Sequence, residues 1–220
     1  HRYSSAASDV YKRQTPNSER TMGTYLGASE MLEFSMDFMD AVNNSKILFT
    51  EGYQFTSDQN FKAFISVLEN TDPNVQLALS LSDPFVVSNF KSRFEDVFSK
   101  RIVDYVFCNK EEAIAMAGEN FVEGLSRISK NFVVTDGANS SVISEEGNIS
   151  EIEAHAVKAI DSNGAGDIYA GSVLHKIVQG KNFRKACEFG NFASSIIVQE
   201  KSPRLSVEGY KNLQKQFEHL

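Results

Sequence analysis

The chain has 220 residues, enough for one α/β domain with its own core, and its 41% hydrophobic and 23% charged residues are typical of globular proteins. A net charge of −7 without a basic face argues against nucleic acid as a partner, and no apolar run is long enough to span a membrane. The two cysteines, Cys108 and Cys187, are too few for a disulfide framework and lack the spacing of metal ligands. We therefore take the cytoplasm as the default location.

Residues 1–14 differ from the rest of the chain. They show neither helical nor strand periodicity, and they lack the apolar core of a signal peptide. We interpret them as an unrelated or artefactual leader, with a natural disordered tail as the alternative. The argument about the fold therefore starts at Thr15.

From residue 31 onwards, predicted helices and strands alternate. Short apolar runs bounded by turn residues predict buried strands at 46–53, 75–81, 102–107 and 132–137. Apolar residues that recur every three or four positions predict helices at 31–42, 58–70 and around 90–98. This alternation predicts an α/β fold, with a largely parallel sheet covered by helices.

The C-terminal third adds a hairpin and three helices. Two alternating segments around Glu145-Glu146-Gly147-Asn148 predict a β-hairpin over 141–152. A further alternating apolar run, 154–160, has the pattern of a strand and leads into a turn and a helix that ends near Gln179. Gly180 is a typical residue just beyond a helix end. Further helices are predicted at 183–199 and 206–217.

The stretch from Asp161 to Asp167, Asp-Ser-Asn-Gly-Ala-Gly-Asp, is the most informative part of the sequence. A turn of small residues before a helix leaves several backbone N–H groups without partners, and the helix dipole makes them a site for phosphate. Gly164 and Gly166 allow the turn and a close approach of the anion. Asp167 would be repelled by that anion, so we expect it to act as a base towards an attacking hydroxyl.

A purely structural interpretation of this stretch remains open. Asp161 or Asn163 would then cap the helix, and the glycines would serve the turn. Two other phosphate-binding motifs are not matched. Tyr169 stands where the dinucleotide fingerprint needs its third glycine, and no Walker A sequence occurs in the chain.

The seven residues 161–167 resemble the C-terminal signature of the PfkB, or ribokinase-like, carbohydrate and nucleoside kinases, Asp-Thr/Ser-x-Gly-Ala-Gly-Asp. The resemblance implies a three-layer ribokinase-like fold, with Asp167 as the catalytic base. It also implies that the turn contacts the phosphates of ATP, through Asp161, Asn163 and the backbone of Gly164, Ala165 and Gly166.

Three further segments match the family's patterns. Asn109 and Glu112 match its Asn-x-x-Glu motif, which implies that they organise Mg²⁺ through water, although a helix cap would explain both residues equally well. Thr135 and Gly137 match an ATP-contacting Thr-x-Gly, while Ser140 replaces the second glycine of that motif. Asn191 resembles an asparagine near the adenine of ATP, and a surface role is the alternative.

Two segments resemble the adenosine-kinase branch of the family. Residues 19–29 are similar to an internal segment in which an arginine, here Arg20, faces the nucleotide phosphates or the transferring group; a solvated arginine is the alternative. Leu81-Ser82-Asp83-Pro84-Phe85 replaces the Asp-x-Asn-x-x-Arg of many sugar kinases. The resemblance therefore implies a nucleoside substrate rather than a free sugar.

The resemblance implies that residues 15–220 are the C-terminal portion of a kinase domain that moves the γ-phosphoryl group of ATP to a primary hydroxyl. The family's N-terminal substrate contacts and most of its lid have no counterpart here, so we expect this chain alone to be weakly active or inactive. A sugar kinase of the same family, a non-catalytic nucleotide-binding fragment and, less in keeping with the motif, a dinucleotide-dependent oxidoreductase are the alternatives. A monovalent-cation requirement and the oligomeric state are left open.

Overall fold

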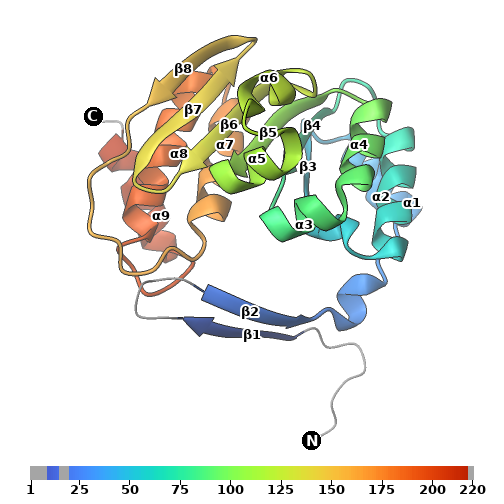
Figure 1. The fold of residues 1–220 in the computed structure, drawn as a ribbon, viewed down its shortest axis with the longest axis horizontal. Helices are drawn as coiled ribbons and strands as arrows, with labels where there is room; N and C mark the ends of the chain where they lie inside the picture. Colours follow the sequence, from blue (N-terminus) through green and yellow to red (C-terminus); the bar gives the residue numbers. More distant parts are fainter. Residues whose placement is uncertain (1–8, 15–19, 218–220) are drawn as a thin grey trace, which may run out of the picture. The chain divides into compact units, whose positions relative to one another are not determined.

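The computed structural model describes residues 9–14 and 20–217, and for residues 9–14 and 20–24 it describes the backbone alone. The chain divides into two compact units, His1–Val103 and Asp104–Leu220. A six-stranded sheet has the strand order β3-β4-β5-β6-β7-β8, and a separate two-stranded sheet contains β1 and β2. The mixed sheet flanked by helices confirms the predicted fold class (Figure 1).

In the first unit, strands alternate with helices as predicted. The parallel pair β3 (Ile47–Glu51) and β4 (Gln76–Ser80) is in register from Ile47 opposite Gln76 to Glu51 opposite Ser80. The helices of this unit are α1 (Met36–Asn43), α2 (Asp58–Asn70), α3 (Pro84–Asn89) and α4 (Lys91–Lys100). Helix α1 begins later than predicted because the Ser35 hydroxyl caps it by accepting a hydrogen bond from the N–H of Phe38.

The core of the first unit is built around one phenylalanine. Phe55 is fully buried, and its ring lies 4.8 Å from that of Phe94 and 5.4 Å from that of Phe64, measured between centroids. Arg93 stacks on the ring of Phe61 and donates a hydrogen bond to the carbonyl of Phe55. Phe55, Phe64 and Phe94 therefore form an aromatic cluster in this core, and Phe61 is half-buried beside it.

The N-terminal residues contain a strand that periodicity did not predict. β1 (Asp9–Gln14) pairs antiparallel with β2 (Arg20–Tyr25), from Asp9 opposite Tyr25 to Gln14 opposite Arg20. Residues 9–14 thus form a strand although their sequence shows no strand periodicity. Strand pairing uses backbone groups, so it can form without an alternating side-chain pattern. The origin of residues 1–14 stays a prediction.

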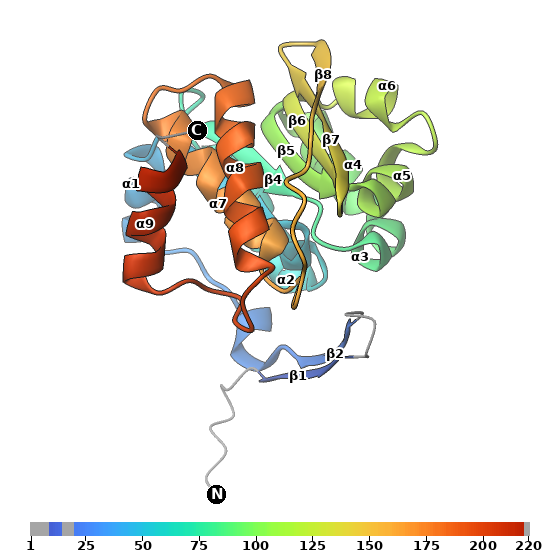
Figure 2. The same cartoon turned by 90° about the vertical axis from the view of Figure 1, so that its left-hand side faces the viewer.

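The second unit has three layers. β5 (Val103–Asn109), β6 (Ser129–Asp136), β7 (Asn139–Glu145) and β8 (Asn148–Ile152) form its part of the sheet, with antiparallel pairing from β6 to β8. Figure 2 shows α7 (Ala165–Val178) and α8 (Phe183–Ile197) on one face, and α5 (Lys110–Ala117) and α6 (Phe121–Ser126) on the other. Helix α9 (Val207–Phe217) packs on α8.

Burial explains both the successes and the failures of the sequence pattern in this unit. β5 is buried at six of its seven positions, which is why its continuous apolar run predicted a strand. Helix α6 was not predicted, because its six residues are too few to show a period. Residues 153–158 have no regular secondary structure, so the strand pattern noted at 154–160 is wrong; this segment instead forms a loop beside α8.

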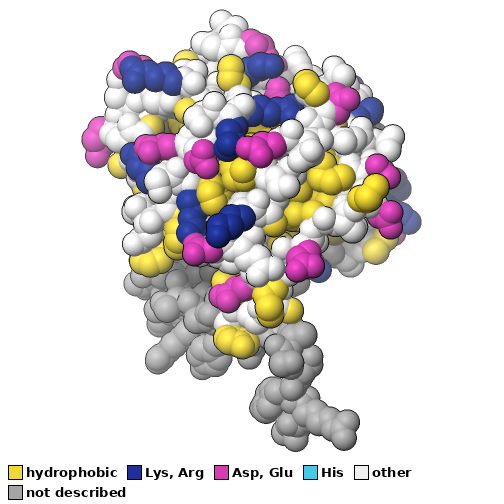
Figure 3. Space-filling view, turned by 90° about the vertical axis from the view of Figure 1, so that its right-hand side faces the viewer, with side chains coloured by type: hydrophobic (Ala, Val, Ile, Leu, Met, Phe, Trp, Pro, Cys, Tyr) yellow, Lys and Arg dark blue, Asp and Glu magenta, His cyan; other side chains and the backbone are white. Residues whose placement is uncertain are grey.

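The surface carries charges of both signs. On the face where α1, α2 and α4 lie, Figure 3 shows Lys or Arg and Asp or Glu side chains interspersed around hydrophobic ones. Over residues 9–14 and 20–217, no helix combines the length and the apolar character that crossing a membrane requires.

Candidate active site

The turn before α7 is held by its first carboxylate. Asp161 is buried, and its Oδ1 atom accepts hydrogen bonds from the backbone N–H of Asn163, at 3.0 Å, and from the Asn163 side-chain amide, at 2.5 Å. The backbone N–H of Asp161 in turn donates to the carbonyl of Val198 in the segment after α8. Asp161 and Asn163 therefore shape the turn and anchor it to the end of α8.

Gly164 is required by this turn for two reasons. Its φ angle is +75°, a left-handed conformation that side chains disfavour. A Cβ atom at this position would also lie 2.4 Å from the carbonyl oxygen of Pro203. The glycine is therefore explained by the fold, whether or not a ligand binds.

The first turn of α7 has open backbone donors. Gly164 occupies the position that usually carries a capping side chain, and no side chain caps this helix. The N–H of Ala165 donates to the carbonyl of Ser162, whereas the N–H groups of Gly166 and Asp167 have no acceptor among the described residues. Unpartnered N–H groups at a helix N-terminus attract an anion.

Gly166 has no explanation within the fold. Its φ angle is not left-handed, and a Cβ atom placed there would meet nothing within 4 Å. A glycine inside a helix costs about 0.5–1 kcal/mol of stability relative to alanine. The space beside Gly166 is therefore open, so a ligand in the adjoining cavity could approach the backbone closely here.

A cavity of about 640 Å³ lies against this turn. Its lining brings together residues from four segments that are distant in the sequence, among them the predicted residues Thr135, Gly137, Ala165, Gly166 and Asn191. Thr135 lies near the end of β6, and Gly137, with φ of +57°, turns the chain towards β7. Five of the predicted nucleotide-contacting residues thus surround one cavity.

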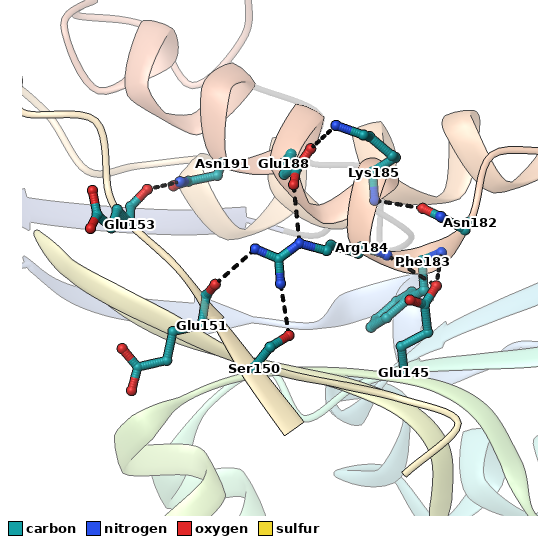
Figure 4. A network of polar contacts seen from close by, with 10 residues as sticks. All are labelled: Glu145, Ser150, Glu151, Glu153, Asn182, Phe183, Arg184, Lys185, Glu188 and Asn191. Atoms are coloured by element: carbon teal, nitrogen blue, oxygen red, sulfur yellow. Dashed lines mark hydrogen bonds and ion pairs between the residues drawn. The ribbon is translucent and has the colours of Figure 1, made fainter. Parts of the chain in front are cut away.

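Asn191 fixes the loop that forms another wall of this cavity. Its side-chain amide donates to the carbonyl of Glu153 at 2.6 Å, joining α8 to the residue that follows β8 (Figure 4). The backbone N–H of Ile160 donates to the carbonyl of Val198 at the other end of the loop. The loop between Glu153 and Ile160 is therefore tied to α8 at both ends.

A polar network ties the hairpin β7–β8 to the start of α8. Figure 4 shows Arg184 reaching from α8 to the Ser150 hydroxyl, the carbonyl of Glu151 and the carboxylate of Glu188. Glu145 accepts hydrogen bonds from the N–H groups of Phe183 and Arg184 at the helix N-terminus. These contacts hold the hairpin and α8 as fixed walls of the cavity.

Asp167 faces away from this cavity. It is exposed, and it lines a second cavity of about 520 Å³ together with residues of α7, α8, α9 and the segment that contains Pro203 and Arg204. Gly166 and Asp167 are consecutive, yet they line different cavities. At the start of α7, Gly166 thus lines the 640 Å³ cavity, whereas the Asp167 carboxylate lines the 520 Å³ cavity.

Asn109 and Glu112 form a complete helix cap at the start of α5. The Asn109 Oδ1 atom accepts from the N–H of Glu112 at 2.8 Å, and Glu112 Oε2 accepts from the N–H of Asn109 at 3.0 Å. The Asn109 amide also donates to Glu112 Oε1 at 2.7 Å. Both carboxylate oxygens are thus engaged, and neither residue lines the cavity. These two side chains do not fit direct Mg²⁺ ligation, and their predicted role through water stays a prediction.

The remaining residues to place are candidate metal ligands, Arg20 and two histidines. No group of three or more His, Cys, Asp or Glu side chains within residues 25–217 is arranged to hold a metal ion. Arg20 lies in β2, and its side chain is outside the described residues. His155 and His175 are exposed, and the ring of His155 packs edge-on against Phe192.

The sequence analysis missed several residues of the first cavity. Ser141, Lys158 and Tyr169 line it, and none of them belongs to a motif. Lys158 was hidden because its segment has the alternation of a strand. Tyr169 lies at a core position of α7, and only its hydroxyl distinguishes it from an ordinary packing residue. Ser141 could have been suspected only because it follows the Thr135–Gly137 motif closely in the sequence.

The chain is similar to kinases in sequence and in structure. It is 29% identical to adenosine kinase 1 of Arabidopsis thaliana over 147 residues, which cover 57% of this chain and 42% of that protein. An adenosine kinase from Sinorhizobium meliloti superposes with a TM-score of 0.86 at 27% identity, over 95% of this chain and 66% of that one. A probable sugar kinase from Rhizobium etli does so with 0.85 at 27% identity, over 96% and 66%.

The chain thus spans less than two thirds of the length of these relatives. Residues 10–209, nearly the whole chain, match the family described as pfkB family carbohydrate kinase. This match includes the turn at Asp161–Asp167 and every wall of the first cavity. The chain belongs to the pfkB family of carbohydrate kinases.

Proposed function

We propose that this chain binds ATP in the 640 Å³ cavity and belongs to a kinase that phosphorylates a primary hydroxyl of a nucleoside, with the adenosine 5′-hydroxyl as the first candidate. The observation that carries the proposal is Gly166. It lines the cavity, its N–H group has no acceptor among the described residues, and none of their atoms lies within 4 Å of where its Cβ would be. A phosphate group would accept that N–H and fill that room.

We assign a separate role to each residue of the turn. Asp161, Asn163 and Gly164 hold the backbone in place, and the N–H groups of Gly166 and Asp167 donate to phosphate oxygens whose charge grows during the transfer. ATP, when bound, supplies the phosphoryl group. The carboxylate of Asp167 lies on the other side of the turn, where it accepts the proton of the attacking hydroxyl.

The nucleoside is favoured by the names of the relatives. The Arabidopsis and Sinorhizobium proteins are both adenosine kinases, and the segment Leu81–Phe85 resembles that branch. The Rhizobium structure, at the same identity, is a probable sugar kinase, and this favours a sugar of the same family as the second candidate. No step is assigned to Mg²⁺, because the predicted ligands Asn109 and Glu112 satisfy each other.

Phosphoryl transfer is tested by ADP release with a panel of nucleosides and sugars. We expect adenosine to give the highest rate among the acceptors. A higher rate with ribose or fructose than with any nucleoside would contradict the nucleoside assignment and favour the sugar kinase. ATP binding without ADP release for any acceptor would contradict phosphoryl transfer by this chain and would leave only the nucleotide-binding part of the proposal.

A further inference from the structure

One side chain of the nucleotide cavity carries a polar group that the fold does not use. Tyr169 is 4% exposed and lines the cavity, and its hydroxyl is buried without a hydrogen-bond partner among the described residues. Buried hydroxyl groups are almost always paired, because leaving one unpaired costs free energy. A phenylalanine would fill the same space without that cost.

The ring of Tyr169 is fixed by its neighbours. A Cβ atom on Gly190 of α8 would lie 3.2 Å from the Cδ1 atom of Tyr169, so the helix backbone packs directly against the ring. The thiol of Cys187 and the hydroxyl of Ser141 are the polar groups near the tyrosine oxygen, but neither makes a hydrogen bond of ordinary geometry with it. The hydroxyl is therefore held in place next to potential partners without being paired.

Ser141 connects this hydroxyl to the cavity. It lies on β7, is 4% exposed and lines the same cavity as Gly166. A serine hydroxyl can donate one hydrogen bond and accept others at the same time. Ser141 can therefore accept a hydrogen bond from Tyr169 and donate one into the cavity.

We propose that Ser141 and Tyr169 form a polar floor for the bound nucleotide. In the bound state the Tyr169 hydroxyl donates to Ser141, and Ser141 donates to an acceptor atom of the nucleotide. Tyr169 is thus a positioning residue that acts through Ser141. The inference rests on the proposed function, because it takes the cavity to be the nucleotide site.

The two effects of Tyr169→Phe have opposite signs, and this separates a positioning role from a structural one. Removing an unpaired buried hydroxyl should raise the thermal midpoint of the unliganded chain, by about 2–4 °C. Losing the hydrogen bond to Ser141 in the bound state should weaken Mg·ATP binding about three- to tenfold. A residue needed only for packing would not raise stability while lowering affinity.

The experiment combines calorimetric titration with Mg·ATP and thermal unfolding of the full chain. Ser141→Ala should weaken binding to the same extent as Tyr169→Phe, and the double variant should be no weaker than either single one. Tyr53→Phe is the matched control, because its hydroxyl donates to the carbonyl of Ser82 in the other unit. That control should leave Mg·ATP affinity unchanged and should not raise the thermal midpoint.

Unchanged Mg·ATP affinity in Tyr169→Phe overturns this inference alone. A lower thermal midpoint or an unfolded variant also overturns it, because the hydroxyl would then already have a partner in the unliganded chain. Absence of binding by the unaltered chain would instead overturn the proposed function, and the unfolding data would still report whether the hydroxyl is unpaired.

Discussion

Two helices of the second unit begin in contrasting ways. At the start of α5, Asn109 and Glu112 satisfy each other's backbone N–H groups in a complete capping box. At the start of α7, no side chain caps the helix, and the N–H groups of Gly166 and Asp167 have no acceptor among the described residues. Both helix starts contain residues that match motifs of the kinase family, Asn109 and Glu112 at α5 and Asp161–Asp167 at α7.

The comparison distinguishes a helix start whose motif residues cap the helix from one that has no side-chain cap. The capping box at α5 satisfies the N–H groups of Asn109 and Glu112 through each other's side chains, so these two residues are sufficiently explained by stability. At the α7 start, the space beside Gly166 is open, and the N–H groups of Gly166 and Asp167 have no acceptor among the described residues. These two features, together with the adjoining cavity, are the basis of the proposed phosphate site.

The largest effect is expected for Asp167→Asn. The amide cannot accept the hydroxyl proton, so ADP release with the best acceptor should fall by about 10²–10⁴-fold. Mg·ATP affinity should stay equal or increase, because a negative charge beside the phosphates has been removed. Steady-state kinetics and calorimetry measure the two quantities. Unchanged turnover would remove Asp167 from the role of base.

Gly164→Ala should produce the largest loss of stability at this turn. The alanine would have to adopt a left-handed conformation and would clash with the carbonyl of Pro203. We expect the free energy of unfolding to fall by about 2–3 kcal/mol, measured by urea denaturation. A variant as stable as the parent would show that the turn does not have the described geometry. Because this change alters the fold, it is unsuitable as a test of binding.

Glu112→Ala tests the other side of the comparison. Loss of the capping box should lower the free energy of unfolding by about 0.5–2 kcal/mol, whereas Mg·ATP affinity at saturating Mg²⁺ should not change. The neighbouring and exposed Glu111→Ala is the matched control and should change neither quantity. If Glu112→Ala weakened Mg·ATP binding and Glu111→Ala did not, the predicted magnesium role would be supported against the capping explanation.

A smaller effect concerns pH. Burial raises the pKa of the Cys187 thiol, so the folded chain keeps this proton in a range where the unfolded chain loses it. The unfolded state is therefore favoured as pH rises above the ordinary thiol pKa of about 8.5, by about 0.8 kcal/mol at pH 9. Cys187→Ala should show a weaker dependence between pH 8 and pH 10 in denaturant titrations. Identical pH profiles would contradict this assignment.

The sequence predicted the fold well where burial is continuous or periodic. The buried strand β5 and the amphipathic helix α2 were found because packing against one core imposes their patterns. Strand β1 was missed because it pairs through its backbone and its side chains show no alternation. Residues 153–160 were mistaken for a strand because their apolar residues alternate, although the segment forms a loop.

The candidate site was predictable only as far as motifs extend. Gly166 and Asp167 were found from local sequence, because the chemistry of a turn is carried by consecutive residues. The partition of these two residues between separate cavities could not be predicted, since it depends on α9 and the Pro203 segment. The role inferred for Tyr169 could not be predicted either, because the absence of a partner for its hydroxyl depends on how α7 packs in the fold.

The central claim is that the open start of α7 binds phosphate, and Gly166→Ala tests it most directly. The new methyl group meets no atom of the fold, so the chain should stay folded and gain a few tenths to about 1 kcal/mol of stability. Calorimetric titration should show Mg·ATP affinity reduced on the order of tenfold or more, because the methyl occupies the place of a charged acceptor. Gly171→Ala, one turn later in the same helix and equally unobstructed, is the control and should retain full affinity. Equal affinity in the two variants would contradict the account.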